Sequence, residues 1–203
     1  MNHIGATYAI PRTSRRRAGG VCRARGFTLV ELMITIFVAA ILITIAVPSF
    51  QHVIASTRLT TTSNSLVNAL QVARMQAIKR NADAQFCGNN ANDNGTATTL
   101  GAACGTQGGA VYVLDTTTAG ATAAVQAHAA PAITGGTEHL HGNITPLVFD
   151  ATGVAHAIGS TAPFAGTIAD VCTTTLSSNN HRVITMTTGT IIATASTSAG
   201  SCP

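Results

Sequence analysis

The stretch RGFTLVELMITIFVAAILITIAVPSF, residues 25–50, decides the fold of this chain. Its apolar part, residues 27–47, has 21 residues and a single charge, Glu31. At about 1.5 Å per residue such a segment forms a helix of roughly 31 Å, which matches the ~30 Å hydrocarbon core of a bilayer. The stretch therefore predicts a membrane-spanning helix, with a short segment before it and a domain after it.

The basic residues lie mostly before the apolar stretch. Six of the 11 Lys and Arg residues precede Phe27, and no acidic residue does. From Phe27 onward five basic residues stand against seven acidic ones, so this part has a formal charge of −2 although the whole chain has +4. Because Lys and Arg beside a spanning helix stay on the cytoplasmic side, we expect residues 1–26 in the cytoplasm and the C-terminal domain in the periplasm or outside the cell.

A cleaved secretory signal is one alternative for this N-terminus. Its apolar region has about 7 to 15 residues and precedes a small-residue cleavage site. Here the apolar run is longer, and VPSFQHV (47–53) follows it, without an A-x-A site. A plain membrane anchor is the other alternative, but it does not account for Glu31.

The residues from Arg25 to Glu31, RGFTLVE, resemble the type III signal of type IV pilins and type II secretion pseudopilins. The resemblance implies that a prepilin peptidase cuts after Gly26 and that the new N-terminal Phe27 is methylated. It also implies that Pro48 kinks the helix, as a proline commonly does at this place in pilins.

Glu31 has a physical argument of its own. A carboxylate in a membrane helix costs up to about 2.5 to 3.5 kcal/mol on insertion scales, so it is usually present for a partner. The resemblance implies that the partner is the free amine of Phe27 in a neighbouring subunit. A tolerated acid at the membrane interface remains the alternative.

The second half of the helix, residues 51–81, has an amphipathic pattern. Leucine and alanine recur at steps of seven, four, three and four, with polar residues on the other faces, which predicts one stripe packed on a globular domain; the stripe is Leu59, Leu66, Leu70, Ala73 and Ala77. The segment LVNALQVARMQAIKRN (66–81) resembles a recurring feature of the GspH/FimT family. Arg74, Lys79 and Arg80 are interpreted as a solvated helix end, favoured by the helix dipole.

Residues 82–203 read as a β-rich domain. Short β-type runs alternate with clusters of Gly, Asn and Thr, and predict strands at 82–87, 110–114, 146–150, 154–158, 171–176, 182–187 and 190–195. Hairpins are expected at residues 150–153 and at Thr188-Gly189, and loops at 89–109 and 116–142. LVFDATG and RVITMTTG resemble motifs of the GspH/FimT family. The expected fold is α+β and type IV pilin-like, with a long N-terminal helix packed on a small antiparallel β-sandwich-like domain.

The cysteines agree with export. Cys22 would be lost with the leader, which leaves an even set with three possible pairings. Local closure favours Cys87 with Cys104 and Cys172 with Cys202, each worth roughly 3 kcal/mol. A zinc site is the alternative, but no C-x-x-C pair is present.

The histidines do not point to an enzyme. A metal site at His139 and His141, with His128 and His156 elsewhere, can be imagined, but a polar face of an irregular loop is the preferred interpretation. No G-x-S-x-G, H-E-x-x-H or phosphate-binding glycine loop occurs. We expect no enzymatic activity, no metal and no cofactor.

Nucleic-acid binding is a minority hypothesis. Some proteins that resemble this family capture DNA through basic residues in a C-terminal G-R-x-R-like stretch, and the corresponding part here, residues 189–192, has no arginine. After Arg80 the only basic side chain is Arg182, against six acids. Phosphate binding needs clustered Lys and Arg, so DNA contacts by Arg74, Lys79, Arg80 and Arg182 are disfavoured.

Together these features predict a minor pilin of the FimT type, which helps to initiate or cap a type IV pilus. Type II secretion pseudopilin of the GspH type is the alternative, and DNA-binding pilin the second one. The end of the 66–81 helix segment and the C-terminal disulfide slightly favour the pilus. The expected partners are other pilins or pseudopilins, prepilin peptidase and the inner-membrane assembly platform, and the expected location is the inner membrane and then the filament.

Overall fold

A computed structural model describes residues 26–115, 123–133, 137–198 and 200–203, apart from the side chain of Pro48. The chain divides into two units, which meet between Ile43 and Thr44. Residues 1–25 of the expected leader, including Cys22, lie outside the described residues.

The helix α1 (Leu29–Arg80) has 52 residues and continues through Pro48. In the C-terminal unit it buries the expected stripe, because all five of its leucines and alanines are fully inaccessible. The step of seven between Leu59 and Leu66 contains a further buried residue, Ser63, whose hydroxyl donates to the carbonyl oxygen of Leu59 at 2.9 Å. The amphipathic interpretation of this half is therefore confirmed.

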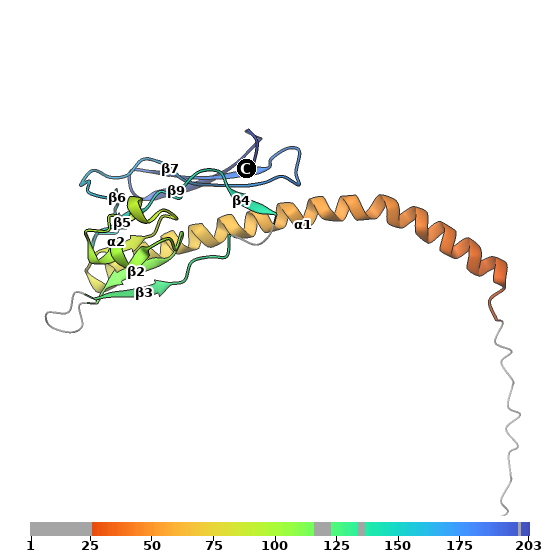
Figure 1. Cartoon of the computed structure of the whole chain (residues 1–203), viewed down its shortest axis with the longest axis horizontal. Coiled ribbons are helices and arrows are strands. Elements are labelled where there is room, and N and C mark those ends of the chain that lie inside the picture. Colours follow the sequence, from red (N-terminus) through yellow and green to blue (C-terminus); the bar gives the residue numbers. More distant parts are fainter. Residues whose placement is uncertain (1–25, 116–122, 134–136, 199) are drawn as a thin grey trace, which may run out of the picture. The chain divides into compact units, whose positions relative to one another are not determined.

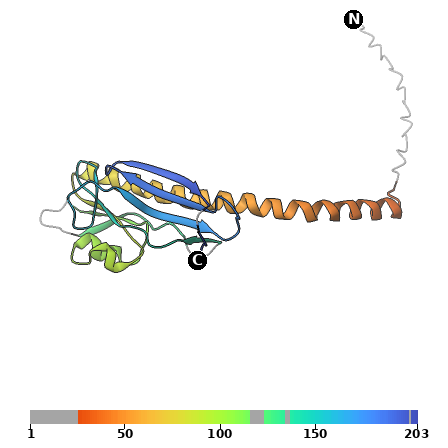
Figure 2. The same cartoon turned by 90° about the horizontal axis from the view of Figure 1, so that it is seen from above.

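Two antiparallel sheets accompany this half of the helix (Figures 1 and 2). The first has the strand order β3-β2-β1-β5-β6 and the second β4-β7-β8-β9. The strands are β1 (Ala84–Phe86), β2 (Val111–Leu114), β3 (Ala124–His128), β4 (Glu138–Leu140), β5 (Leu147–Phe149), β6 (Ala155–Ala157), β7 (Gly166–Thr173), β8 (His181–Thr187) and β9 (Ile191–Thr197).

One core joins the helix stripe to both sheets. Phe86 and Phe149 come from the first sheet and Val171 and Ile184 from the second, and all four pack in the same cluster as Leu70 of α1. Because the helix supplies one stripe and each sheet one face, the unit has the α+β, pilin-like architecture that the sequence predicts.

Both predicted hairpins are present. β8 and β9 are joined by a turn in which Thr188 and Gly189 have φ of 53° and 66°. Positive φ at both central residues is what a type I′ turn requires, and glycine reaches it without steric cost. β5 and β6 are joined by the turn that starts at Asp150.

The Asp150 carboxylate organises the β5–β6 turn. Its Oδ1 accepts hydrogen bonds from Thr152 N at 2.8 Å, Thr152 Oγ1 at 2.6 Å and Val154 N at 3.1 Å, and its Oδ2 lies 3.1 Å from His156 Nε2. Desolvation alone would raise the pKa of Asp150, but these hydrogen bonds together lower it to about 2.

The prediction of a loop at residues 89–109 is wrong, because this segment contains the 3₁₀ helix η1 (Ala91–Asn94) and the helix α2 (Thr99–Cys104). Asn94 is fully buried, accepts from Gly88 N at 2.7 Å and donates to the carbonyl oxygens of Gly88 and Gly105. A Cβ at Gly101 would lie 2.1 Å from the carbonyl oxygen of Asn94, so the two helices meet only because residue 101 is glycine. The segment lacks apolar periodicity, and its two helices are held together by the hydrogen bonds of a side-chain amide and by the close approach that a glycine allows.

The prediction of a loop at residues 116–142 is also wrong in part, because this segment contains β3 and β4. Residues 116–122 and 134–136 of it lie outside the described residues. β3 is alanine-rich and β4 has three residues, so neither has a recognisable alternation. The predicted strand 171–176 is shifted, since β7 begins at Gly166 and ends at Thr173. A register irregularity between Thr167 and Ala169 interrupts its alternation.

Truncation of Leu70 tests the helix stripe. We expect Leu70→Ala to lower the free energy of unfolding by about 2 to 5 kcal/mol, because it leaves a cavity between α1 and the sheets. Met75→Ala is the matched control on the same helix, since Met75 is 54% exposed, and it should change the value by no more than about 0.5 kcal/mol. Urea unfolding of the full-length chain in mild detergent measures both, and equal effects would contradict the packing.

Removal of the Asp150 carboxylate tests the β5–β6 turn. Asp150→Ala should lower the free energy of unfolding at pH 7 by about 0.5 to 1.5 kcal/mol, because the exposed Thr152 and the half-buried Val154 and His156 lose their acceptor. Asp150→Asn keeps Oδ1 and should lose less.

The pH dependence of this effect has a definite sign. The pKa of Asp150 falls from 3.8 in the unfolded chain to about 2 in the folded one, so the carboxylate stabilises the fold above about pH 4 and loses this contribution as the pH falls through about 2. Urea unfolding at several pH values should show the difference between the native chain and Asp150→Ala narrowing over this range, and a constant difference down to pH 2 would contradict this assignment.

Candidate functional site

The expected cleavage point lies in an exposed segment before α1. Residues 26–28 are not helical, the side chain of Phe27 is 75% exposed, and a Cβ at Gly26 would meet no atom within 4 Å. Among the described residues, none therefore covers the peptide bond between Gly26 and Phe27. Cleavage and methylation at these two residues stay predictions.

The helix begins with a cap that the sequence reading missed. The backbone N–H of Glu31 donates to Thr28 Oγ1 at 3.2 Å, and Leu32 N donates to the carbonyl oxygen of Thr28 at 3.1 Å. Thr28 and Glu31 have the T-x-x-E spacing of a capping box, which was the available signal. A carboxylate in the first turn is also favoured by the helix dipole. Glu31 thus stabilises the start of its own helix, whatever else it binds.

The first part of α1 exposes apolar side chains on every side. An 18-residue window of the helix has a mean hydropathy of 2.7 and none of it is buried. Neighbours in sequence point in different directions around a helix, yet Leu32, Ile36, Phe37 and Val38, which lie on different faces, are all exposed. A helix that is apolar all round belongs in a membrane or inside an assembly. Within the described residues no side chain forms an ion pair with Glu31.

Two disulfides brace the C-terminal unit, and they join the pairs that the sequence favours. Cys87, the residue after β1, pairs with Cys104 at the end of α2. Cys172 of β7 pairs with Cys202, so the end of the chain is attached to the second sheet. Both bonds close local loops, of 17 and 30 residues in sequence separation.

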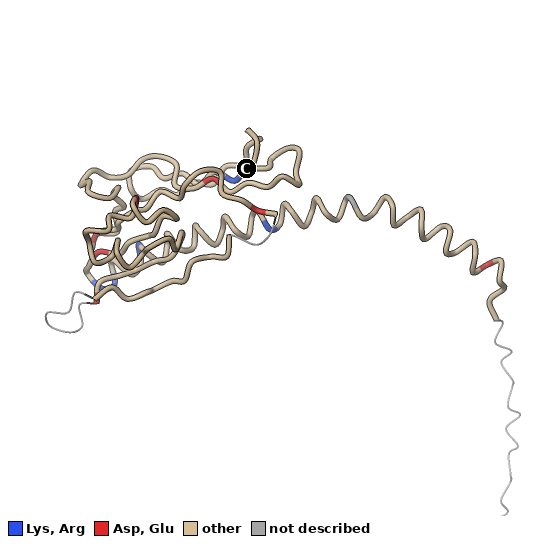
Figure 3. The backbone as a smooth tube through the Cα atoms, viewed as in Figure 1, with Lys and Arg blue, Asp and Glu red and all other residues tan. Residues whose placement is uncertain are grey.

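The basic residues in the described part of the chain do not form one patch. Arg74 donates to the carbonyl oxygen of Thr190 at 3.4 Å, Arg80 to Gln76 Oε1 at 3.3 Å, and Arg182 to the carbonyl oxygen of Asn179 at 2.8 Å. These contacts engage three of the guanidinium groups with the protein itself. Figure 3 shows Lys and Arg interspersed with Asp and Glu along the C-terminal unit.

An open, mostly apolar depression does lie at the end of the helix. It is lined by Gln71, Arg74, Met75, Ile78 and Lys79. Of the predicted DNA-binding residues, it brings together Arg74 and Lys79, while Arg182 belongs to the start of β8. Two cations neutralise few phosphates, so the depression lacks the clustered Lys and Arg that a phosphate backbone needs.

Two family models match the chain. A prokaryotic N-terminal methylation motif matches residues 22–47. The family described as type II transport protein GspH matches residues 62–190, well over half of the chain. No curated protein and no solved structure matches it. The two matches confirm the resemblance to type IV minor pilins and pseudopilins.

The scattered basic residues predict poor DNA binding. In a gel-shift titration in detergent of the chain that begins at Phe27, without the six arginines that precede it, against duplex DNA, we expect no saturable binding at moderate salt, because few phosphates would be neutralised. The variant Arg74→Gln/Lys79→Gln should behave like the native chain. Binding that falls steeply with salt and is lost in this variant would contradict the expectation.

Proposed function

Because this chain belongs to the GspH family, we propose that it is a minor pseudopilin of a type II secretion system, which enters the filament through its N-terminal helix. The family description supports the secretion system over the pilus. The sequence by itself slightly favours the pilus. The proposed role is assembly, without a catalytic step.

One observation carries the proposal: an exposed, apolar, membrane-length helix, whose first part lies within the match to an N-terminal methylation motif and which contains a single carboxylate near its start. Such a helix is stable in a bilayer or packed against similar helices. The C-terminal unit has its own core and two disulfides, so it is suited to an oxidising compartment. We propose that this unit lies in the periplasm and that the helix first anchors it in the inner membrane.

Filament entry is proposed to depend on Glu31. Cleavage after Gly26 creates a free amine at Phe27, and an amine from one subunit can pair with Glu31 of the next in an apolar surrounding. Charge-assisted pairing of this kind is worth more there than in water, because the dielectric constant is low. The other partners are prepilin peptidase and the inner-membrane assembly platform.

A type IV pilus is the second candidate machine. The helix end at residues 66–81 and the disulfide-tethered C-terminus, Cys172–Cys202, favour it, as they do from the sequence. In that case the chain would be a FimT-like minor pilin that initiates or caps the pilus.

Neutralisation of Glu31 tests the assembly mechanism. Glu31→Gln removes the charge but keeps a residue suited to the capping box with Thr28. We expect normal leader removal and about tenfold less of this variant in isolated filaments, in line with the 1.5 to 3 kcal/mol of a charged hydrogen bond. Quantitative immunoblotting of filament and membrane fractions measures both.

Two further variants separate charge from capping. Ile34→Leu, an exposed apolar exchange in the same helix, is the control and should enter filaments normally. Glu31→Ala removes the charge and the side-chain part of the capping box, while its backbone N–H still donates to Thr28. If Glu31→Gln enters filaments normally while Glu31→Ala does not, Glu31 acts through the cap, and the charge-pairing mechanism is wrong.

A deletion strain distinguishes the two machines. We expect loss of type II substrates from the medium with piliation and twitching unchanged. Loss of piliation with normal secretion would instead assign the chain to the pilus. Complementation with the native gene controls both readouts.

A further inference from the structure

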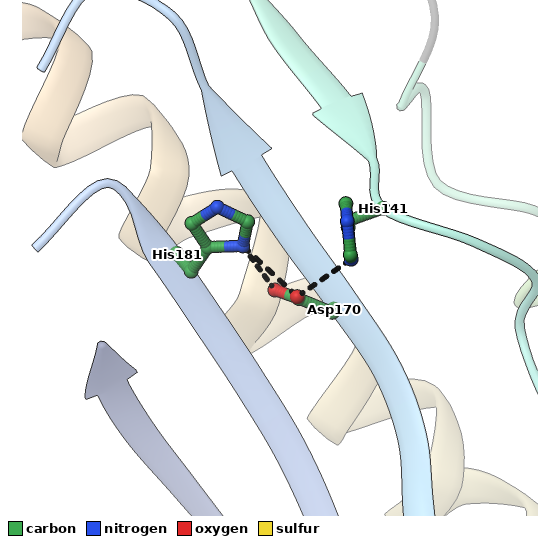
Figure 4. Close-up of side chains that lie close together, drawn as sticks. All are labelled: His141, Asp170 and His181. Carbon is green, nitrogen blue, oxygen red and sulfur yellow. Dashed lines mark hydrogen bonds and ion pairs between the residues drawn. The ribbon is translucent and has the colours of Figure 1, made fainter. Parts of the chain in front are cut away.

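The second sheet brings three chemistry-bearing side chains together on one face. His141 follows β4, and its backbone N–H donates to the carbonyl oxygen of Asp170 at 2.9 Å, so His141 lies opposite Asp170 on β7. His181 of β8 pairs with Cys172, two residues along β7 from Asp170. Since residues two apart on a strand share a face, the two imidazoles flank the Asp170 carboxylate (Figure 4).

This face is the outer one. Leu140 pairs with Val171, and both pack against the core, so their neighbours in sequence point the other way. Cys172 shares the outer face and is bonded to Cys202, which attaches the chain terminus beside His181. The disulfide therefore fixes the end of the chain next to the cluster.

Both imidazoles direct Nδ1 at the same carboxylate. His181 Nδ1 lies 2.9 Å from Asp170 Oδ2 and 3.1 Å from Oδ1, and His141 Nδ1 lies 3.4 Å from Oδ2. All three ligand atoms lie within 4.8 Å of one another. Ligand atoms that surround a tetrahedral ion at about 2.0 to 2.1 Å are about 3.3 Å apart. Small side-chain adjustments, mostly at His141, bring the three atoms to that spacing.

The cluster is buried at His181 and open to solvent at His141. The side chain of His181 is fully buried, that of Asp170 is 15% exposed and that of His141 is 52% exposed. Within the described part of the chain, no Lys or Arg forms an ion pair with Asp170. With neutral imidazoles the cluster has one negative charge and a solvent path, as a cation site requires.

We propose that His141, Asp170 and His181 bind one divalent ion of the zinc class. Imidazole nitrogens with a carboxylate suit zinc and similar transition metals, whereas calcium and magnesium prefer shells of oxygen ligands. Three protein ligands leave a fourth position, which faces solvent beside His141 and takes a water molecule. The ion would cross-link β4, a three-residue edge strand, to β7 and β8.

His181 limits the affinity. Binding through Nδ1 places the ring proton on Nε2, which is buried and has no hydrogen-bond partner among the described residues. Loss of a partner for a ligand's second nitrogen typically costs about 10- to 100-fold in metal affinity. The site is therefore weaker than a structural zinc site with complete outer contacts.

In the sequence, His139 and His141 form an H-x-H pair. His139 lies opposite Cys172 on the same outer face, is exposed, and is not in the cluster. It therefore provides a control that is matched in residue type, strand and face.

The test uses the full-length chain in mild detergent, without a histidine tag, with its disulfides intact and after treatment with a chelator. Zn²⁺ is titrated by calorimetry and Co²⁺ by visible absorption. We expect one equivalent to bind, with the ligand-field bands of four-coordinate Co²⁺ and a higher melting temperature. His141→Ala should weaken binding at least about tenfold, and His139→Ala should leave it within about twofold.

Asp170→Asn gives a second variant that protects the fold, because its amide oxygen still accepts from His181. It removes the anionic ligand and should also weaken binding at least about tenfold. Absence of a stoichiometric Zn²⁺ site in the native chain would overturn the proposal, and the cluster would then be a His–Asp–His hydrogen-bonded group. Equal loss in His139→Ala, or native affinity in folded Asp170→Asn or His141→Ala, would overturn it as well.

Discussion

The rest of the structure depends on one electrostatic constraint: a single carboxylate, Glu31, lies in an apolar helix long enough to span a bilayer. Burial of such a charge is costly without a partner, and the described residues form no ion pair with it. Its backbone N–H is bound by Thr28, so the start of the helix is ordered before any partner arrives. The family assignment fits this constraint, because the proposed role brings the segment against the helices of neighbouring subunits.

One helix serves two environments. In its first part apolar side chains point in all directions, and in its second part only one stripe is apolar and buried, beginning near Ala55 and ending at Ala77. The backbone continues through Pro48 between them. The stripe, the two sheets and the two disulfides all belong to the C-terminal unit, so its core does not include the exposed first part of the helix.

Sequence reasoning succeeded where order comes from local periodicity and failed where it comes from distant polar contacts. The stripe at Leu59, Leu66 and Leu70 repeats at helical spacing, and the β8–β9 turn has its Thr188-Gly189 signal in adjacent residues. The region 89–109 is ordered instead by the buried Asn94 amide, by Gly101 and by Cys104. The cluster at Asp170 could not be predicted from the sequence either. It forms only because β4 pairs with β7 in one register, and β4 is too short to show a strand pattern.

The state of the mature N-terminus tests the central claim most directly. Mass spectrometry of the protein isolated from filament fractions should find an N-terminal peptide that begins at Phe27 and has a methyl group on its amine. Such a terminus would establish both the processing pathway and the amine that Glu31 is proposed to pair with. An N-terminus that precedes residue 27, one created after the apolar stretch, or an unmethylated Phe27 in assembled filaments would contradict the account.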